Sequence, residues 1–118
     1  MTAWFADPSI ETVAFCLRLR AGMEAEYRRR HDELWPDMRA ALLGEGILHY
    51  EIYLHAPTRM LFAHQVRRAA RGPIAESEAV IARWRAYMAD ILEMDGDYPV
   101  REELARQFRL VADETAGQ

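Results

Sequence analysis

The residues with the clearest capacity for chemistry lie in one short stretch, Tyr27-Arg-Arg-Arg-His31-Asp-Glu-Leu-Trp-Pro36. Tyr27 and His31 are four residues apart and would share one face of a helix. Proline is excluded from a helix interior but suits a first turn, so we expect one helix to end near Asp32 or Glu33 and another to begin near Pro36. His31 would then lie at a helix C-terminus, which raises the imidazole pKa and favours acid–base chemistry near neutral pH.

Trp35 adds an indole beside this predicted helix break. A phenol, an imidazole and an indole brought together there would form a small polar pocket lined by aromatic rings. The alternative interpretation is that Tyr27 and His31 are half-buried surface residues and that Trp35 belongs to the core. The pattern by itself leaves both interpretations open.

Composition and charge restrict what the whole chain can be. With 118 residues, 51% of them apolar and 10% aromatic, the chain can bury one compact core, and we expect residues 1–118 to form a single domain. A net charge of −4 disfavours non-specific binding to nucleic acid. The basic runs at 28–30 and 67–68 are offset by nearby acidic residues, so we interpret them as solvated faces.

Cysteine content and the length of the apolar runs bear on the compartment. Cys16 is the single cysteine, and its apolar neighbours favour a buried small side chain over a nucleophile. No apolar run reaches the length of a membrane span, and residues 1–11 lack the basic and apolar regions of a signal peptide. We therefore expect a cytoplasmic protein that does not bind membranes.

The elements that must position these side chains can be predicted from periodicity and turn signals. Strands are predicted where β-branched and aromatic residues cluster between turn signals, at 12–19, 47–54, 59–66 and 107–111. Helices are predicted at 23–32, 36–43 and 77–92, the last capped by Ser77. The remaining segments are a loose lead-in at 1–11, an irregular loop at 95–99, the start of a turn at 102–103 and a frayed tail at 112–118.

The order of these elements predicts the fold class. Strand, helix pair, strand, strand, helix and strand is the order of the α+β, ferredoxin-like (split βαβ) arrangement, an antiparallel sheet with helices on one face. Alternation along the second strand places Tyr50 and Ile52 on one face and His49 and Glu51 on the other. The sheet face without helices would need a cover, and a second copy of the chain is the simplest one.

Metal and nucleotide chemistry have little support in the sequence. The histidines at 31, 49, 55 and 64 fit no short metal-binding motif, and no glycine-rich phosphate loop is present. Acid–base chemistry or simple binding remains, with His31, Tyr27, Tyr50 and Trp84 as candidates. For Tyr50 and Trp84 considered alone, core packing is the favoured interpretation. We predict no metal and no organic cofactor.

Several segments together resemble the L-rhamnose mutarotase family. They are EYRRRH at 26–31, LWP at 34–36, YEIYL at 50–54, LFA at 61–63 and RWRAYM at 83–88, and the resemblance covers roughly residues 12–110. It implies a dimeric α/β barrel of ferredoxin-like domains, that is, a homodimer. It also implies an isomerase that interconverts the α and β anomers of L-rhamnose without a metal or organic cofactor.

The resemblance also implies roles for particular residues. The proton-donor histidine of the family falls on His31, which would protonate the ring oxygen while an unidentified group accepts the anomeric proton. The family's sugar-contacting tyrosines fall on Tyr27 and Tyr50, and its tandem tryptophans fall on Trp84 and Arg85. Trp35, the indole of the aromatic-lined pocket expected at the helix break, is also a predicted sugar-binding residue.

The sequence departs from the family pattern at two places. Arg85 stands where the family typically has a second tryptophan, and residues 97–99 read Asp-Tyr-Pro where an Asn-Ser-Pro-like run is typical. A guanidinium offers charged donors where an indole offers a flat apolar face. A related deoxysugar or an acidic sugar is therefore an alternative substrate to L-rhamnose.

Two other classes of function are compatible with this fold. One is a monooxygenase-like or haem-handling enzyme, in which His31 or His64 would be an axial ligand or base and the aromatic residues would line a cofactor pocket. The other is a sugar-binding module that does not catalyse a reaction. Colour or bound haem in the purified protein would favour the first, and binding without anomer exchange would favour the second.

Overall fold

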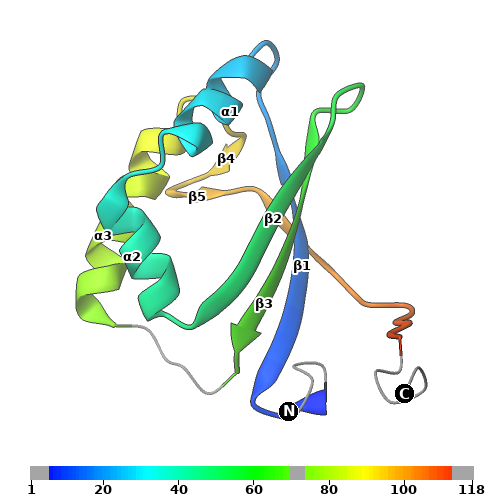
Figure 1. The fold of residues 1–118 in the computed structure, drawn as a ribbon. Helices are drawn as coiled ribbons and strands as arrows, with labels where there is room; N and C mark the ends of the chain where they lie inside the picture. Colours follow the sequence, from blue (N-terminus) through cyan, green and yellow to red (C-terminus); the bar gives the residue numbers. More distant parts are fainter. Residues whose placement is uncertain (1–5, 70–73, 113–118) are drawn as a thin grey trace.

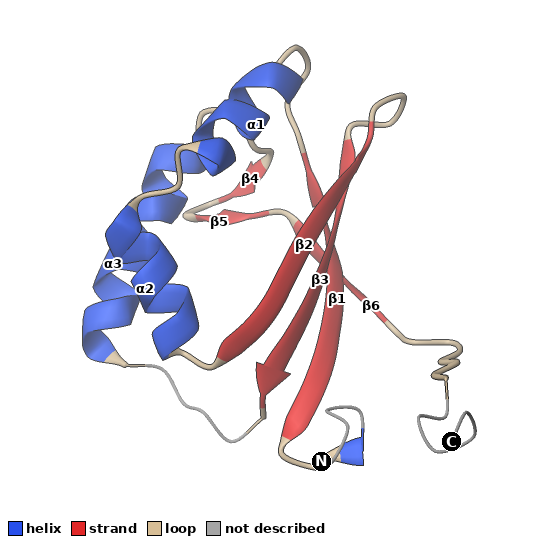
Figure 2. Cartoon of the chain, in the orientation of Figure 1, coloured by secondary structure: helices blue, strands red, loops and turns tan. Residues whose placement is uncertain are grey.

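The protein folds as one antiparallel sheet with its helices on one side, as seen in a computed structural model (Figures 1 and 2). The structure describes residues 6–69 and 74–112, so the first five residues of the predicted lead-in and most of the predicted tail lie outside the described residues. The architecture is α+β and ferredoxin-like, as predicted.

Three long strands and a short one make up the sheet, in the spatial order β2-β3-β1-β6. The strands are β1 (Ile10–Arg18), β2 (Ile47–His55), β3 (Met60–Arg68) and β6 (Arg101–Leu104). All three ladders are antiparallel. Because β1 begins at Ile10, the predicted lead-in is two residues too long.

The helical layer contains α1 (Glu24–Asp32), α2 (Pro36–Gly44) and α3 (Ala75–Met88). Trp35 is the residue that precedes α2, and Pro36 occupies its first turn, so the predicted helix break is confirmed. Ser77 is not a cap: α3 begins at Ala75 after Ile74, and Ser77 is buried inside its first turn. We predicted the cap from residue type, but no capping side-chain hydrogen bond forms at this end.

The end of α3 also differs from the prediction of about Leu92. The helix stops at Met88 because the backbone of the following segment bonds to the end of β1: the Arg20 amide donates to the Ile91 carbonyl, and the Glu93 amide donates to the Arg18 carbonyl. Sheet-like bonds thus replace the last predicted turn of helix. The chain then forms β4 (Met94–Asp95) and β5 (Tyr98–Pro99), a small hairpin where an irregular loop was predicted.

The last strand is β6, and the prediction of a turn at 102–103 and a strand at 107–111 is wrong. Residues 101–104 pair with β1, where Arg101 lies opposite Leu17 and Leu104 lies opposite Ala14. Residues 105–112 form no regular structure, and Phe108 and Leu110 are 79% and 83% exposed. The three charged residues of β6 concealed its strand character, since an edge strand needs few apolar residues.

The core lies between the helices and the sheet face that they cover, which we call the inner face. It is built from β1 and β3 side chains and from helix side chains that pack on them: Phe15, Leu17, Leu19, Leu61, Ala63, Tyr27, Met38, Trp84 and Met88 among others. Tyr50 and Ile52 of β2 also pack against it, whereas Leu48 and Leu54 stay 46% and 41% exposed. The opposite sheet face, the outer face, carries no helix (Figure 2).

Candidate active site

The first part of the site is the pair of rings that α1 presents to the core. Tyr27 is 8% exposed and belongs to the core cluster, and His31 is half-buried one turn later. Their ring centroids lie 4.3 Å apart at an angle of 33°. The predicted sharing of one helix face is confirmed, and α1 ends at Asp32, one residue beyond His31.

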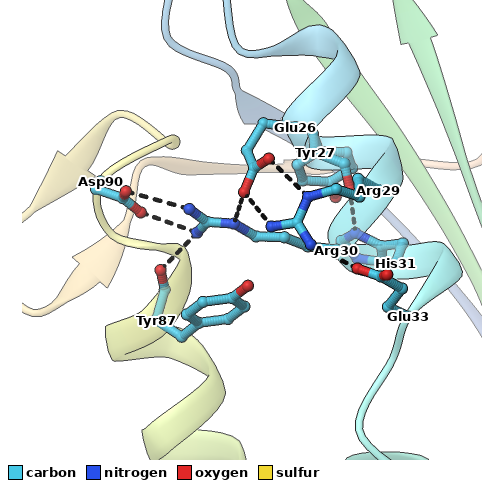
Figure 3. Close-up of polar contacts among 8 residues, drawn as sticks. All are labelled: Glu26, Tyr27, Arg29, Arg30, His31, Glu33, Tyr87 and Asp90. Atoms are coloured by element: carbon cyan, nitrogen blue, oxygen red, sulfur yellow. Dashed lines mark hydrogen bonds and ion pairs between the residues drawn. The ribbon is translucent and has the colours of Figure 1, made fainter.

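A backbone hydrogen bond orients the imidazole of His31 (Figure 3). Nδ1 lies 3.0 Å from the carbonyl oxygen of Tyr27, and a carbonyl can only accept, so Nδ1 carries a proton and donates it. In the neutral ring the lone pair is then on Nε2. Burial lowers the pKa of His31 below its ordinary value, outweighing the opposing effects of the Tyr27 carbonyl and of Asp32.

The direction of this shift corrects the expectation from the sequence. We predicted a raised pKa for His31 from its place at a helix C-terminus, and that place is confirmed. Desolvation of the ring among Tyr27 and Trp84 disfavours the charged form more strongly than the helix terminus favours it. His31 is therefore a neutral imidazole at neutral pH.

A cluster of aromatic rings from the α1–α2 break and from α3 meets His31 through Trp84. Trp84 meets His31 edge-on, with centroids 5.5 Å apart, and Trp35 meets Trp84 in the same way at 5.0 Å. Tyr87 completes the group at 5.2 Å from Trp35 and 5.6 Å from Trp84. Tyr87 lies in the segment RWRAYM at 83–88 but was not among the predicted site residues, although its spacing of three residues from Trp84 could have indicated it.

Arg30 links the C-terminal end of α1 to the C-terminal end of α3 through hydrogen bonds (Figure 3). Its guanidinium is 8% exposed, donates to both carboxylate oxygens of Asp90 at 2.9 and 3.2 Å, and donates to the Tyr87 carbonyl at 2.7 Å. It also donates to Glu26 and lies 4.2 Å above the Tyr87 ring centroid. Arg30 is thus buried, which corrects the prediction that the run 28–30 is solvated throughout; Arg28 is exposed as predicted.

The sheet contributes a second phenol. Tyr50 lies on the inner face of β2, directly opposite Gln65 of β3, and the Gln65 side chain hydrogen-bonds it. Burial raises the pKa of Tyr50, whereas Gln65 and the charge of Arg101 lower it. Burial and the neighbouring Tyr50 phenol raise the pKa of Tyr27. Tyr50 packs against the same core cluster that contains Tyr27.

Gln65 and Arg101 are the residues of this site that the sequence did not indicate. Arg101 lies opposite Leu17 on the inner face, with its guanidinium carbon 3.7 Å from the centroid of the Phe15 ring. It also forms an ion pair with Glu103. Only the register of β1 against β3 and β6 could have identified both residues, and that register is not visible in the sequence.

Arg85 was predicted to act together with Trp84, but the two side chains have different neighbours. Its guanidinium carbon lies 4.3 Å from the centroid of the Tyr98 ring, in β5. On α3 it shares a face with Ile81 and Met88, both of which pack in or against the core. Arg85 therefore faces the gap between α3 and β5, and no contact with the His31 rings is seen in the described residues.

The other histidines lie outside this arrangement. Nε2 of His49 lies 3.1 Å from Glu51, Nδ1 of His55 lies 2.7 Å from the Thr58 hydroxyl, and both side chains are exposed. His64 lines a cavity of about 450 Å³ on the outer face together with Phe108 and Leu110. In the part of the chain that the structure describes, no group of three or more His, Cys, Asp or Glu side chains could hold a metal ion.

Among 6–69 and 74–112, no helix is long and apolar enough to cross a membrane.

Comparison with known proteins gives a consistent set of matches. The profile of the L-rhamnose mutarotase family matches residues 12–111. An L-rhamnose mutarotase from Agrobacterium fabrum is 41% identical over 87% of this chain and 98% of its own length. One from Burkholderia orbicola is 44% identical over 86% of this chain and 99% of its own.

Comparison with solved structures also matches this chain to an L-rhamnose mutarotase. An L-rhamnose mutarotase from Formosa agariphila superposes with a TM-score of 0.75 at 30% identity, over 86% of this chain and 99% of that one. A putative antibiotic biosynthesis monooxygenase from Nitrosomonas europaea reaches 0.50 at 8% identity, over 83% of this chain and 88% of that one, and this likeness concerns the fold alone.

Proposed function

The chain belongs to the L-rhamnose mutarotase family, and from this we propose that it interconverts the α and β anomers of L-rhamnose. The observation that carries the proposal is the match of residues 12–111 to the family, with the Tyr27–His31–Trp84 group inside the matched region. The enzyme is accordingly an isomerase that changes the configuration at one carbon.

His31 is the acid–base residue in this proposal. Opening the ring of a hemiacetal requires a proton to leave the anomeric hydroxyl and a proton to reach the ring oxygen, and closing it on the other face reverses both transfers. A half-buried imidazole with one free nitrogen can exchange such a proton. The chemistry consists of proton transfers and requires no metal or organic cofactor.

The other predicted site residues have binding roles in this proposal. Tyr27 and Tyr50 would hydrogen-bond sugar hydroxyl groups, and Trp84 with Trp35 would form an apolar wall against the C–H groups and the methyl group of the sugar. Arg85 would contact the end of the sugar nearest β5, since it lies on the core-facing side of α3.

Assembly is the remaining part of the proposal. Tyr53 and Phe62, a directly opposed pair on the outer face, are 60% and 38% exposed, and Phe108 and Leu110 of the C-terminal segment border the same face. Burying these rings against a second copy would remove apolar surface from water, so we propose a homodimer formed through the outer face. The single-domain organisation over residues 1–118 and the cytoplasmic location stay predictions.

Saturation-transfer NMR on a panel of sugars tests the activity. Saturating the anomeric proton of one L-rhamnose anomer should attenuate the signal of the other in the presence of enzyme, far more strongly than for sugars without the methyl group. Binding of L-rhamnose without such transfer would indicate a sugar-binding module instead. Transfer with another sugar and none with L-rhamnose would refute the substrate assignment.

A further inference from the structure

The position of the acid–base residue relative to the apolar wall depends on how α1 lies against α3. We propose that Arg30 is a positioning residue for anomer exchange: its guanidinium holds the end of α1 against the end of α3 and thereby sets the position of His31 against Trp84. This inference rests on the proposed function, in which His31 transfers the proton and Trp84 forms part of the wall against the sugar.

The imidazole of His31 is fixed to its own helix. Nδ1 lies 3.0 Å from the carbonyl oxygen of Tyr27, one turn earlier on α1, and the centroids of the two rings lie 4.3 Å apart. Both contacts are internal to α1, so Nε2 moves with the helix as a whole. Whatever holds α1 in place therefore also aims the nitrogen that exchanges the proton.

The apolar wall belongs to other elements. Trp84 lies on α3 and meets the His31 ring edge-on, with the centroids 5.5 Å apart, and Trp35 directly precedes α2. A sugar that packs on Trp84 must therefore reach a proton-transfer group that a different helix carries. A displacement of about 1 Å between the two can cost on the order of a hundredfold in rate, because proton transfer requires hydrogen-bonding distance.

The Arg30 guanidinium joins these elements through four hydrogen bonds (Figure 3). Nε donates to Glu26 at 2.7 Å, and the terminal nitrogens donate to the Tyr87 carbonyl at 2.7 Å and to the two carboxylate oxygens of Asp90 at 2.9 and 3.2 Å. Glu26 lies one turn before Arg30 and holds its side chain along α1. The other acceptors lie in the last turn of α3 and two residues beyond its end.

The same guanidinium also supports the aromatic rings beside His31. Its central carbon lies 4.2 Å from the centroid of the Tyr87 ring. The centroid of the Tyr87 ring in turn lies 5.6 Å from that of Trp84 and 5.2 Å from that of Trp35. Arg30 thus contacts both the backbone and the ring of the residue behind the wall, so a change at Arg30 should reach Trp84 as well as His31.

The chemistry of the side chain indicates that geometry is its main contribution. Arg30 is 8% exposed, and a buried charge loses hydration that its ion pair regains only in part, so such a pair is weak evidence for stability. A guanidinium is planar and holds its N–H donors in a rigid fork, which a lysine ammonium lacks. The paired bonds to Asp90 and the stack on Tyr87 both use that fork, and together they fix the distance and the rotation of α1 against α3.

Kinetics of two substitutions separate positioning from stability. Arg30→Met removes the donors, and kcat for L-rhamnose should fall by about tenfold to a hundredfold with much less change in KM, because the sugar meets the same side chains while Nε2 of His31 is displaced. Arg30→Lys keeps the charge beside Glu26 and should restore the resistance to urea but only a small part of kcat. Full recovery of kcat in Arg30→Lys, or a loss confined to KM, would overturn the role of the fork.

NMR of the free enzyme gives a readout that does not depend on activity. In Arg30→Met the Nδ1 proton of His31 should keep its hydrogen bond to Tyr27, because that bond is internal to α1. The carbon-bound protons of the imidazole should shift, and their nuclear Overhauser contacts with Trp84 should weaken, because that contact joins two helices. Unchanged imidazole signals in a variant with reduced kcat would overturn the positioning role.

Arg28→Met is the matched control for both measurements. Arg28 lies on the same helix, its side chain is exposed, and its guanidinium is 3.8 Å from Asp32 of the same helix. Its removal should leave kcat and the imidazole signals of His31 as they are in the wild type. Equal changes in Arg28→Met and Arg30→Met would show that loss of any positive charge from α1 has this effect, which would overturn the specific role of Arg30.

The contact with Asp90 is tested by a double-mutant cycle. Asp90→Asn replaces one acceptor oxygen by a donor and should lower kcat in the same way as Arg30→Met, but by less. If both act through one contact, the double variant should be no slower than Arg30→Met alone, whereas losses that multiply would overturn the proposal. A wild-type enzyme that exchanges no L-rhamnose anomers refutes the proposed function and this inference with it; normal exchange by folded Arg30→Met refutes only this inference.

Discussion

The two faces of the sheet carry similar side chains in very different surroundings. On the inner side, Tyr50 of β2 and Tyr27 of the covering helix α1 are largely buried, and burial raises the pKa of both phenols. On the outer face, Tyr53 is 60% exposed, and its hydroxyl simply donates to Glu51 at 3.0 Å. Residue type alone therefore does not distinguish the two faces; desolvation by the helical layer does.

The histidines repeat this contrast. His31 is packed between Tyr27 and Trp84 on the inner side and has a lowered pKa. His49 and His55 are exposed and bond to a carboxylate and to a hydroxyl group. Catalysis is expected from the face that one chain completes by itself, and association from the face that it leaves uncovered.

The largest expected effect comes from replacing His31, on the inner side of the sheet, and comparing it with the replacement of His64 on the outer face. A well-placed acid–base group contributes on the order of a hundredfold, so His31→Ala should reduce anomer exchange by about that factor, while His64→Ala on the outer face should stay near the wild-type rate. His31→Gln, which keeps polarity without a titrating proton, should be nearly as inactive as His31→Ala.

Saturation-transfer NMR measures each rate, and circular dichroism checks that each variant retains its fold. If the folded His31→Ala variant exchanged anomers at the wild-type rate, the acid–base group would have to lie elsewhere. His64 would then be the first residue to consider.

A second test changes the outer face instead. Phe62→Glu puts a charge into the proposed interface, twice in a symmetric dimer, and should weaken association on the order of a hundredfold or more. Leu43→Glu on α2 is the matched control, because Leu43 is 48% exposed and lies in the helical layer.

Sedimentation over a range of concentrations distinguishes the two variants. Wild type and Leu43→Glu should be dimers where Phe62→Glu is a monomer. A monomeric wild type would remove the proposed dimer, and dissociation by Leu43→Glu would move the interface to the helical layer.

The parts of the structure that local patterns determine could be predicted from the sequence. The Pro36 break, the one-turn spacing of Tyr27 and His31, and the first three strands all depend on residues close together in the chain, and the structure confirms them to within two residues. β6 could not be predicted in this way, because Arg101 is held in a strand by pairing with β1, more than eighty residues earlier in the chain.

The electrostatic state of the site depends even more on distant residues. The sign of the His31 pKa shift is set by burial under Trp84, which the helix position of His31 does not reveal. In the sequence, Arg30 does not differ from the other residues of its basic run. In the structure, the end of α3 and the residues after it place the Tyr87 carbonyl and Asp90 within hydrogen-bonding distance of Arg30. Tertiary contacts thus decide which of several similar side chains is buried and which stays in solvent.

The third prediction concerns Arg30, which links α1 to the end of α3 through hydrogen bonds. Arg30→Met removes the donors to Asp90 and to the Tyr87 carbonyl and should lower the free energy of unfolding by about 1–2 kcal/mol, a modest value because Asp90 is largely solvated. Arg28→Met is the control: its guanidinium is 3.8 Å from Asp32, both side chains are exposed, and its removal should change little. Urea unfolding measures both, and equal stability losses would show that Arg30 is no more important than its exposed neighbour.

The smallest expected effect concerns Arg85, which stands at the edge of the inner-face site where the family typically has a second indole. Arg85 shares its helix face with Ile81 and Met88, so a tryptophan at residue 85 would also be directed toward the gap between α3 and β5. An indole packs on apolar sugar surface and, by analogy with aromatic pairs, adds about 0.5–1.5 kcal/mol, so Arg85→Trp should raise the preference for L-rhamnose over sugars without the methyl group by about 2–10-fold. Arg83→Trp is the control, since Arg83 is exposed and pairs with Asp37 of α2. Saturation-transfer rates on the sugar panel give the ranking. If Arg85→Trp and Arg83→Trp leave it equally unchanged, residue 85 does not set specificity, and the discrimination must come from the rings around His31.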